Sequence, residues 1–182
     1  MLGWAKALVV YLCFSGLLWG AESGVWLDVP FVNQGKNGCG AASVAMIMQY
    51  WQRQQGQAVR ADAEQIQQEL YSRKAHGIYA SELARYLDQH GFRTFAFRGQ
   101  WSDLKEHLEK GRPLILALKP PRQAEFHYVV VTGIDWGQDV VLTNDPAERK
   151  LLKRERVDFE KEWKATGNWT VLAVPRQPDP GS

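Results

Sequence analysis

The sequence predicts an α+β fold in which a helical N-terminal part is followed by an antiparallel sheet. Apolar residues at helical spacing dominate the stretch from residue 39 to residue 110, whereas β-rich runs dominate residues 113–174. The regular alternation of strands and helices that indicates a parallel sheet is not seen. The chain has 182 residues, 45% hydrophobic and 23% charged, which suits one packed globular domain with short extensions.

The first half is expected to contain one extended segment, four helices and one further strand. Residues 25–32 alternate in polarity and predict a short strand or an extended lead-in, and residues 33–38 predict a turn. Residues 39–53 predict a helix because Val44, Ile47 and Trp51 are spaced as on one helical face. The other elements expected here are helices over residues 62–71, 79–90 and 101–110, with Ser81 and Ser102 as caps, and a strand over residues 92–98.

The second half is expected to consist mainly of strands. Two β-rich runs, residues 128–134 and 140–143, flank a short polar loop and predict a hairpin. The basic residues between positions 149 and 156 are interrupted by Glu155 and by apolar residues, so we interpret them as a solvated loop or strand face. Further strands are expected over residues 113–119 and 169–174.

The two ends of the chain differ from the domain between them. Residues 7–21 form an uncharged apolar run after a short segment with one positive charge, which is typical of a secretory signal and short for a membrane span. We therefore expect residues 1–23 to be a signal peptide or an N-terminal membrane anchor, residues 24–175 to be the folded domain and residues 176–182 to be a flexible tail. The protein is expected to be exported, to the periplasm or the extracellular space, and to be attached to the membrane through residues 7–21 if they are retained.

Charge and motif content argue against several classes of protein. The net charge is +2 and the charges are interleaved, so no nucleic-acid partner is expected. No glycine-rich phosphate loop is present, so no nucleotide cofactor is expected. His76, His90 and His107 are scattered without the spacing of a metal site, and we expect no metal or other cofactor. The sequence does not indicate an oligomeric state.

Cys39 is expected at the first position of a helix, directly after a loop with two glycines. A helix N-terminus offers free N–H groups and partial positive charge, both of which stabilise the reactive thiolate. If residues 1–23 are removed, Cys39 has no second cysteine with which to form an internal disulfide. It is therefore a candidate nucleophile. Gly38 and Gly40 are expected to let a substrate backbone approach it, and the amide of Gln34 is a candidate donor to an oxyanion.

His127 is the candidate base, because it is a titratable residue at the start of an apolar strand. Taken alone, it could equally be an ordinary strand-end histidine. The end of the second strand of a hairpin returns beside the start of the first, so Asp145 or Asn144 is expected next to His127. An acceptor at that place would fix the tautomer of the imidazole and orient it toward a nucleophile.

The order of these residues resembles that of the bacteriocin-processing (double-glycine) cysteine peptidases, and the overall layout is similar to their stand-alone branch. The resemblance covers residues 29–147. It implies a papain-like fold with Cys39 as nucleophile, His127 as general base and acid, Asp145 as the residue that orients His127, and Gln34 as oxyanion donor. The motif residues are, in order, Gln34, Cys39-Gly40, His127-Tyr128 and Asp145-Pro146.

The sequence therefore predicts a cysteine peptidase that hydrolyses a peptide or protein substrate through an acyl-enzyme on Cys39. An amidase or an acyl-transferase would use the same residues and stays open as an alternative. A non-catalytic peptide-binding module on the same fold would not need both Cys39 and His127. An inert cysteine in the core of an envelope protein would not need Gln34 and Asp145 at these places.

Overall fold

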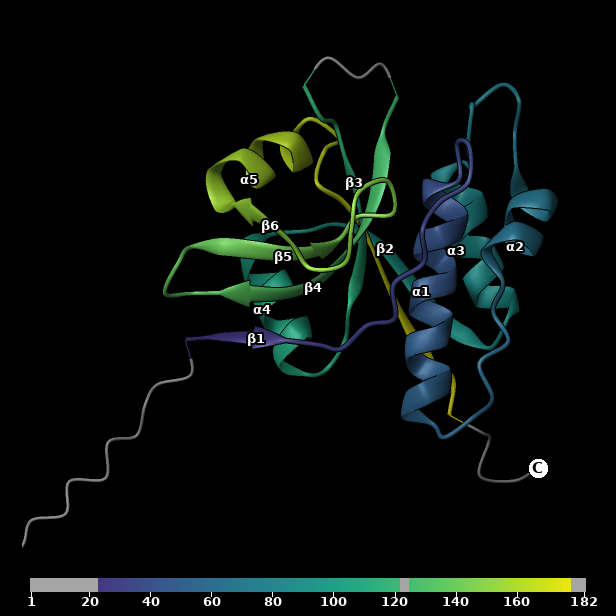
Figure 1. The fold of residues 1–182 in the computed structure, drawn as a ribbon, viewed down its shortest axis with the longest axis horizontal. Coiled ribbons are helices and arrows are strands. Elements are labelled where there is room, and N and C mark those ends of the chain that lie inside the picture. The colour runs from purple at the N-terminus through teal and green to yellow at the C-terminus, as the bar shows by residue number, and fades with distance from the viewer. Residues whose placement is uncertain (1–22, 122–124, 178–182) are drawn as a thin grey trace, which may run out of the picture.

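The computed structural model describes residues 23–121 and 125–177, which form a seven-stranded antiparallel sheet with helices on both faces (Figure 1). The predicted α+β class, with most helices before most strands, is confirmed. The helices are α1 (Cys39–Gln54), α2 (Ala63–Leu70), α3 (Ala80–Gln89), α4 (Trp101–Glu109) and α5 (Arg156–Lys164). The strands are β1 (Gly24–Trp26), β2 (Phe92–Arg98), β3 (Leu114–Leu118), β4 (His127–Asp135), β5 (Val140–Asn144), β6 (Leu152–Glu155) and β7 (Trp169–Pro175).

The strand order of the sheet is β2-β7-β3-β4-β5-β6, and β1 pairs with the end of β4. β4 lies at the centre, paired with β3 on one side and with β5 on the other. β4 and β5 form the predicted hairpin, with a register shift between Val131 and Gly133. Because the two strands are antiparallel, His127 at the start of β4 and the residues that follow β5 come to the same end of the sheet.

Helices cover both faces of the sheet, and each face has its own apolar core. α1 packs on β4, β3 and β7, with α2 and α3 beside it, whereas α4 and α5 lie on the opposite face (Figure 1). Alternate residues of β4 point to the two cores. Tyr128 and Val130 belong to the core under α1, and Val129 and Val131 to the core under α4 and α5. Burial on both faces explains why β3 and residues 128–131 of β4 are apolar runs without polar alternation.

α1 carries Cys39 and is buried along most of its length. Val44 and Ile47 lie in the core, as their spacing predicts, and the small residue Ala45 also packs there. Gly38 is the cap residue of α1 and offers no side-chain hydrogen bond, and the first turn contains no acidic residue. The positive end of the α1 dipole is therefore not neutralised by the helix's own side chains.

The two predicted serine caps are wrong. α3 and α4 each begin one residue before the expected serine, so Ser81 and Ser102 lie within the first turn. The cap position of α4 is Gln100, whose backbone N–H donates to the carboxylate of Asp103 at 2.7 Å. A carboxylate in the first turn accepts this bond and also interacts favourably with the helix dipole, which explains why a serine is not needed there.

The segment of β6 and α5 departs most from the sequence prediction. α5 was not predicted, because Phe159 and Trp163 are its only two buried residues and charged residues surround them. α5 packs on β3, β5 and β6 and covers part of the basic cluster. Lys153 is exposed, but the side chain of Arg154 is only 17% exposed and forms ion pairs with two carboxylates. The interpretation as a solvated face is therefore wrong for Arg154.

Most of the two terminal segments lies outside the described residues. This holds for residues 1–22 of the predicted signal peptide or anchor and for residues 178–182 of the predicted tail. Arg176, the first residue of that tail, is attached to the fold, because its guanidinium pairs with Asp88 at 2.8 Å. Within the described ranges, no helix has the length and apolar character needed to cross a membrane.

Candidate active site

Cys39 is the first residue of α1, as predicted, and its side chain is half-buried. The chain enters the helix through a tight turn. Asn37 has a φ of 56°, and the N–H of Gly38 donates to the carbonyl of Gly35 at 3.1 Å. The N–H groups in the first turn of a helix have no acceptor within the helix. Cys39 therefore lies where free donors and the positive end of the α1 dipole meet.

His127 and Asp145 meet at the end of the sheet, where the hairpin was expected to bring them together. The imidazole Nε2 lies 2.7 Å from Asp145 Oδ1. Asn144, the alternative partner, is buried and binds backbone groups instead, donating to the carbonyl of Val29 and accepting from the N–H of Leu151. Of the two residues that the sequence left open, Asp145 is therefore the one that contacts His127.

The charges at this site stabilise one another. Burial lowers the pKa of His127, but hydrogen bonds to Asp145 and Cys39 and the negative charge of both partners outweigh burial and raise this pKa to about 9. Burial raises the pKa of Asp145, but His127, the N–H of Ala147 and Arg154 together hold it below its usual value. At neutral pH the site therefore contains an imidazolium and an ionised carboxylate. Because Nε2 binds Asp145, Nδ1 is the nitrogen left for Cys39.

Gln34 reaches the same site from the loop before α1. Its backbone N–H donates to the carbonyl of Pro146 at 3.0 Å, which ties this loop to the turn after Asp145. The side-chain oxygen Oε1 is buried and has no hydrogen-bond partner among the described residues. Gln34 lines the same groove as Cys39 and His127. The Gln34 side chain therefore lines the groove of the nucleophile, with an amide oxygen that makes no hydrogen bond to the described residues.

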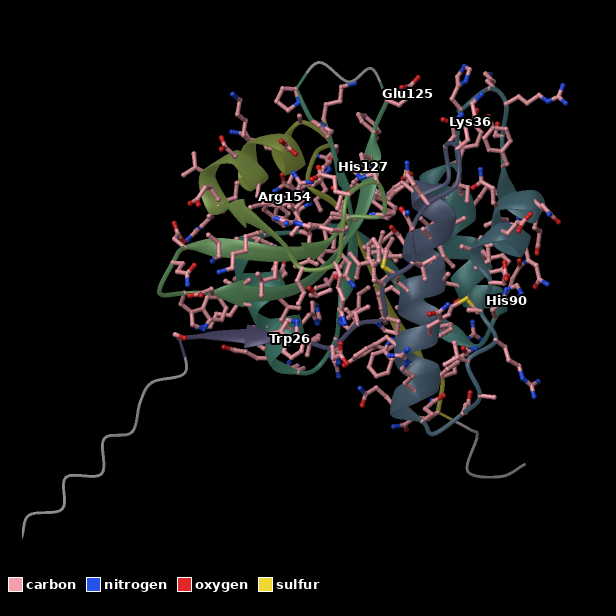
Figure 2. All side chains as sticks on the ribbon, in the orientation of Figure 1. Trp26, Lys36, His90, Glu125, His127 and Arg154 are labelled. Atoms are coloured by element: carbon pink, nitrogen blue, oxygen red, sulfur yellow. The ribbon has the colours of Figure 1, made fainter. Side chains whose placement is uncertain are left out.

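A groove of about 620 Å³ opens beside Cys39 and His127. One wall is the loop that leads into α3, with Ile78 and the exposed Tyr79, and the other is the start of β4 with the exposed Phe126. Figure 2 shows His127 below the end of the molecule at which Glu125 and Lys36 lie. The loop wall is not predicted by the sequence. The nearest sequence signal is Gly77, and the structure has a tight turn there, with a φ of 49° at His76.

The two glycines beside Cys39 do not have the role expected from the sequence. A Cβ atom on Gly40 would lie 3.2 Å from the Ile78 side chain and 3.4 Å from that of Tyr128, and one on Gly38 would lie 3.2 Å from the backbone of Gly35. Both positions are buried. The glycines therefore permit close packing around the start of α1, and the expectation that they let a substrate approach is wrong.

Arg154 is the charged residue of this site that the sequence analysis missed. Its Nη2 donates to Asp145 Oδ2 at 2.5 Å, on the side of the carboxylate away from His127. No sequence motif marks it, and it follows the exposed residue Lys153 in the same basic cluster. Within residues 23–121 and 125–177, no three His, Cys, Asp or Glu side chains form a group that could hold a metal ion.

Comparison with known proteins agrees with this fold. A protein from Bacillus anthracis described as a C39-like peptidase matches with a TM-score of 0.68 and 19% identity, over 85% of this chain and 99% of that one. A double glycine motif protease from an AMS/PCAT transporter, solved with the leader peptide, matches with a TM-score of 0.64 and 22% identity, over 84% of this chain and 95% of that one. A structure concerning the mite allergens Blo t 1 and Der p 1 matches with a TM-score of 0.58 and 9% identity, over 88% of this chain and 73% of that one. The predicted papain-like fold is confirmed.

The sequence itself identifies the family. No curated protein matches the chain at a significant level. The family described as "Peptidase_C39 like family" matches residues 26–171, which is most of the chain and contains all four predicted site residues. The resemblance to double-glycine peptidases inferred from the sequence is confirmed by this match and by the structural likeness. The chain therefore belongs to the Peptidase_C39-like family.

Proposed function

We propose that the chain is a cysteine peptidase that hydrolyses peptide bonds, with Cys39 as nucleophile and His127 as general base and acid. One observation carries the proposal. The imidazole of His127 is hydrogen-bonded to Asp145 at 2.7 Å, its charged form is also stabilised by Cys39, and both His127 and Cys39 line a groove open to solvent. An imidazole held between a thiol and a carboxylate is the arrangement that activates a cysteine nucleophile.

In the first step, the thiolate of Cys39 attacks the carbonyl carbon of the substrate and a C–S bond forms. The N–H of Cys39 and the side-chain amide of Gln34 donate to the oxyanion. The imidazolium of His127 gives its proton to the leaving amine as the C–N bond breaks. Asp145 keeps Nδ1 of the ring directed at the sulfur, because Nε2 is bound to Asp145 throughout.

In the second step, water attacks the acyl-enzyme and gives a proton to His127. A C–O bond forms, the C–S bond breaks, and the acid product leaves with the Cys39–His127 pair restored. Tyr128 does not compete as a base, because burial and the charge of Cys39 raise the pKa of its hydroxyl. An amidase would follow the same steps on a smaller substrate, and an acyl-transferase would replace water by another acceptor.

A polypeptide is the substrate that suits the groove best. Tyr79 is 43% exposed and Phe126 is 55% exposed, so the two groove walls offer aromatic surface to a ligand. Glu125 also lines the groove and provides a charge that a peptide can bind. The similar double glycine motif protease was solved with a leader peptide, which supports a peptide ligand for this chain as well.

The test is a mass-spectrometric survey of cleavage in a mixture of synthetic peptides and unfolded proteins by the full chain. Cys39→Ala should abolish every cleavage while leaving the melting temperature unchanged. The second cysteine of the sequence, Cys13 in the apolar run of residues 7–21, gives the matched control Cys13→Ser, which should keep every cleavage. Cleavage by Cys39→Ala at the wild-type rate would contradict the proposal. Release of ammonia from amides, or acyl transfer to added amines, without peptide cleavage would favour the amidase or acyl-transferase instead.

We also propose that residues 1–23 direct export and that the domain acts outside the cytoplasm. The proposal rests on the apolar run at residues 7–21. Fractionation of producing cells, followed by N-terminal sequencing of the exported chain, tests it. A new N-terminus near Ser23 indicates a cleaved signal, and an intact N-terminus in the membrane fraction indicates an anchor. Intact protein in the cytoplasm would contradict the proposal.

A further inference from the structure

Arg154 occupies the half of the Asp145 carboxylate that His127 leaves free. Oδ1 binds His127 at 2.7 Å and the N–H of Ala147 at 3.0 Å, while Oδ2 accepts from Arg154 Nη2 at 2.5 Å. The Asp145 side chain is 2% exposed. With both oxygens bound, the carboxylate cannot rotate away from His127 without breaking an ion pair in a buried place.

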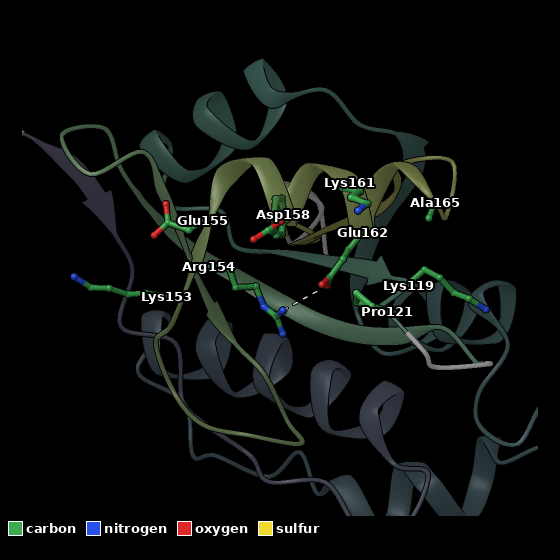
Figure 3. Close-up of a pocket in the computed structure, with 10 residues that line it drawn as sticks. Lys119, Pro121, Lys153, Arg154, Glu155, Asp158, Lys161, Glu162 and Ala165 are labelled. Carbon is green, nitrogen blue, oxygen red and sulfur yellow. Dashed lines mark hydrogen bonds and ion pairs between the residues drawn. The ribbon is translucent and has the colours of Figure 1, made fainter.

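Arg154 also forms an ion pair with a second carboxylate, that of Glu162. Arg154 Nη1 lies 3.5 Å from Glu162 Oε2, and the Glu162 side chain is 13% exposed (Figure 3). Figure 3 shows Glu162 pointing from α5 toward the guanidinium on β6. Arg154 Nε is buried and has no partner among the described residues. Arg154 is thus the cation shared by two nearly buried carboxylates, one of which contacts His127.

We infer that Arg154 is a positioning residue for the hydrolysis proposed above, acting on His127 through Asp145. The inference rests on the proposed function, because it assigns a role in the same site. Arg154 holds the carboxylate in its orientation and keeps it ionised. Without the guanidinium, Asp145 and Glu162 would be two neighbouring carboxylates in a poorly solvated place with no common cation, and Asp145 would accept a proton more easily. A protonated Asp145 no longer stabilises the imidazolium of His127.

A solvent-accessible cavity gives experimental access to Arg154. The cavity has a volume of about 560 Å³ and lies between β6, α5 and the end of β3 (Figure 3). Arg154 and Glu162 both line it. A small cation added to the solution can therefore reach the place that the guanidinium would leave after truncation of the side chain.

The test compares Arg154→Met with Lys153→Met, a neighbouring cation on β6 that is exposed and does not contact Asp145. Arg154→Met should lower kcat/KM by about 10- to 100-fold, the range expected for the loss of a hydrogen bond to a charged group, mainly through kcat. Its acid limb in the pH–rate profile should move to higher pH. Lys153→Met should leave both unchanged. In Arg154→Ala, millimolar guanidinium should restore activity, whereas urea or sodium chloride should not.

A readout without turnover separates this inference from the proposed function. The ¹³C signal of the Asp145 carboxyl should titrate at higher pH in Arg154→Met than in the wild type. If the wild type cleaves nothing but this shift occurs, the proposed function fails and the link between Arg154 and Asp145 stands. If Arg154→Met does not fold, the double variant Arg154→Met/Glu162→Gln takes its place, because it leaves no unpaired carboxylate at position 162. Its control is the single variant Glu162→Gln. Wild-type kcat/KM and an unchanged acid limb in the Arg154 variant would overturn the inference.

Discussion

The two sides of the His127 imidazole face very different surroundings. On one side lie Cys39 and Gln34, half-buried at the edge of a groove. On the other side lies Asp145, whose side chain is 2% exposed, followed by Arg154. The open side is where a substrate can arrive and leave. The closed side holds a fixed charge in a place from which water is nearly excluded, where such a charge acts most strongly.

The two sides of the imidazole are built from different parts of the chain. The open side is local, because Cys39 and Gln34 lie five residues apart around one turn and one helix start. The closed side is assembled from the hairpin of β4 and β5 and from β6, with α5 covering it. Substitutions on the open side should therefore lower kcat alone, whereas substitutions on the closed side should lower both kcat and the free energy of unfolding.

Replacement of Asp145 by Asn should have the largest effect of any change on the closed side, because it removes the charge that faces His127. The amide cannot stabilise the imidazolium as a carboxylate does, so we expect kcat to fall on the order of 10⁴-fold. The free energy of unfolding should fall as well, because Arg154 loses one of its two carboxylates. Asp139→Asn is the control, since Asp139 is 63% exposed and contacts only the surface residue Arg156 among its charged neighbours in the described chain. Equal effects of the two variants on kcat would contradict the assignment.

Gln34→Ala should have a smaller effect that is confined to the open side. Loss of one oxyanion donor is expected to lower kcat by about 10²- to 10³-fold. The rate at which iodoacetamide alkylates Cys39 should not change, because alkylation forms no oxyanion. Unfolding experiments should show wild-type stability, with Gln138→Ala as control. A slower alkylation in Gln34→Ala would mean that Gln34 acts on the thiol and not on the transition state.

The ion pair of His127 and Asp145 should stabilise the folded state only within a limited range of pH. The pKa of His127 is raised from 6.5 to about 9, so its contribution is fully present below pH 6.5 and is lost as the pH rises through 9. The pKa of Asp145 is lowered from 3.8, so its contribution is present above pH 3.8 and is lost as the pH falls through the lower value. Urea unfolding should show that the stability advantage of the wild type over His127→Ala shrinks between pH 6.5 and 9, by up to about 1.4 kcal/mol per pH unit. A constant difference would contradict the pairing.

The smallest effect is expected from breaking an exposed ion pair whose N–O distance is similar to that of the buried pair of His127 and Asp145. Lys150 Nζ lies 2.6 Å from Asp28 Oδ1, and the two side chains are 39% and 62% exposed. Because water and salt screen such a pair, Lys150→Met should change the free energy of unfolding by less than about 1 kcal/mol and leave kcat unchanged. A loss comparable with that of Asp145→Asn would show that burial does not distinguish the two pairs.

The same contrast explains what could be predicted from the sequence. The helix start at Cys39 and the hairpin that brings His127 and Asp145 together follow from local spacing and turn residues. Spacing alone left Asp145 and Asn144 open, because the two are adjacent at the end of the same strand. The structure decides between them, since Asp145 binds His127 and Asn144 binds buried backbone groups. Arg154 was missed because its burial depends on α5, whose apolar face is too small to be detected.

The central claim is that His127 activates Cys39, and the pH dependence of Cys39 alkylation tests it most directly. Peptide mapping by mass spectrometry gives the rate at Cys39 separately from that at Cys13. At pH 6, where an ordinary thiol is almost wholly protonated, Cys39 should react with iodoacetamide faster than free cysteine, and His127→Ala should slow it strongly. Equal rates in the wild type and His127→Ala across pH 5 to 9 would contradict the account.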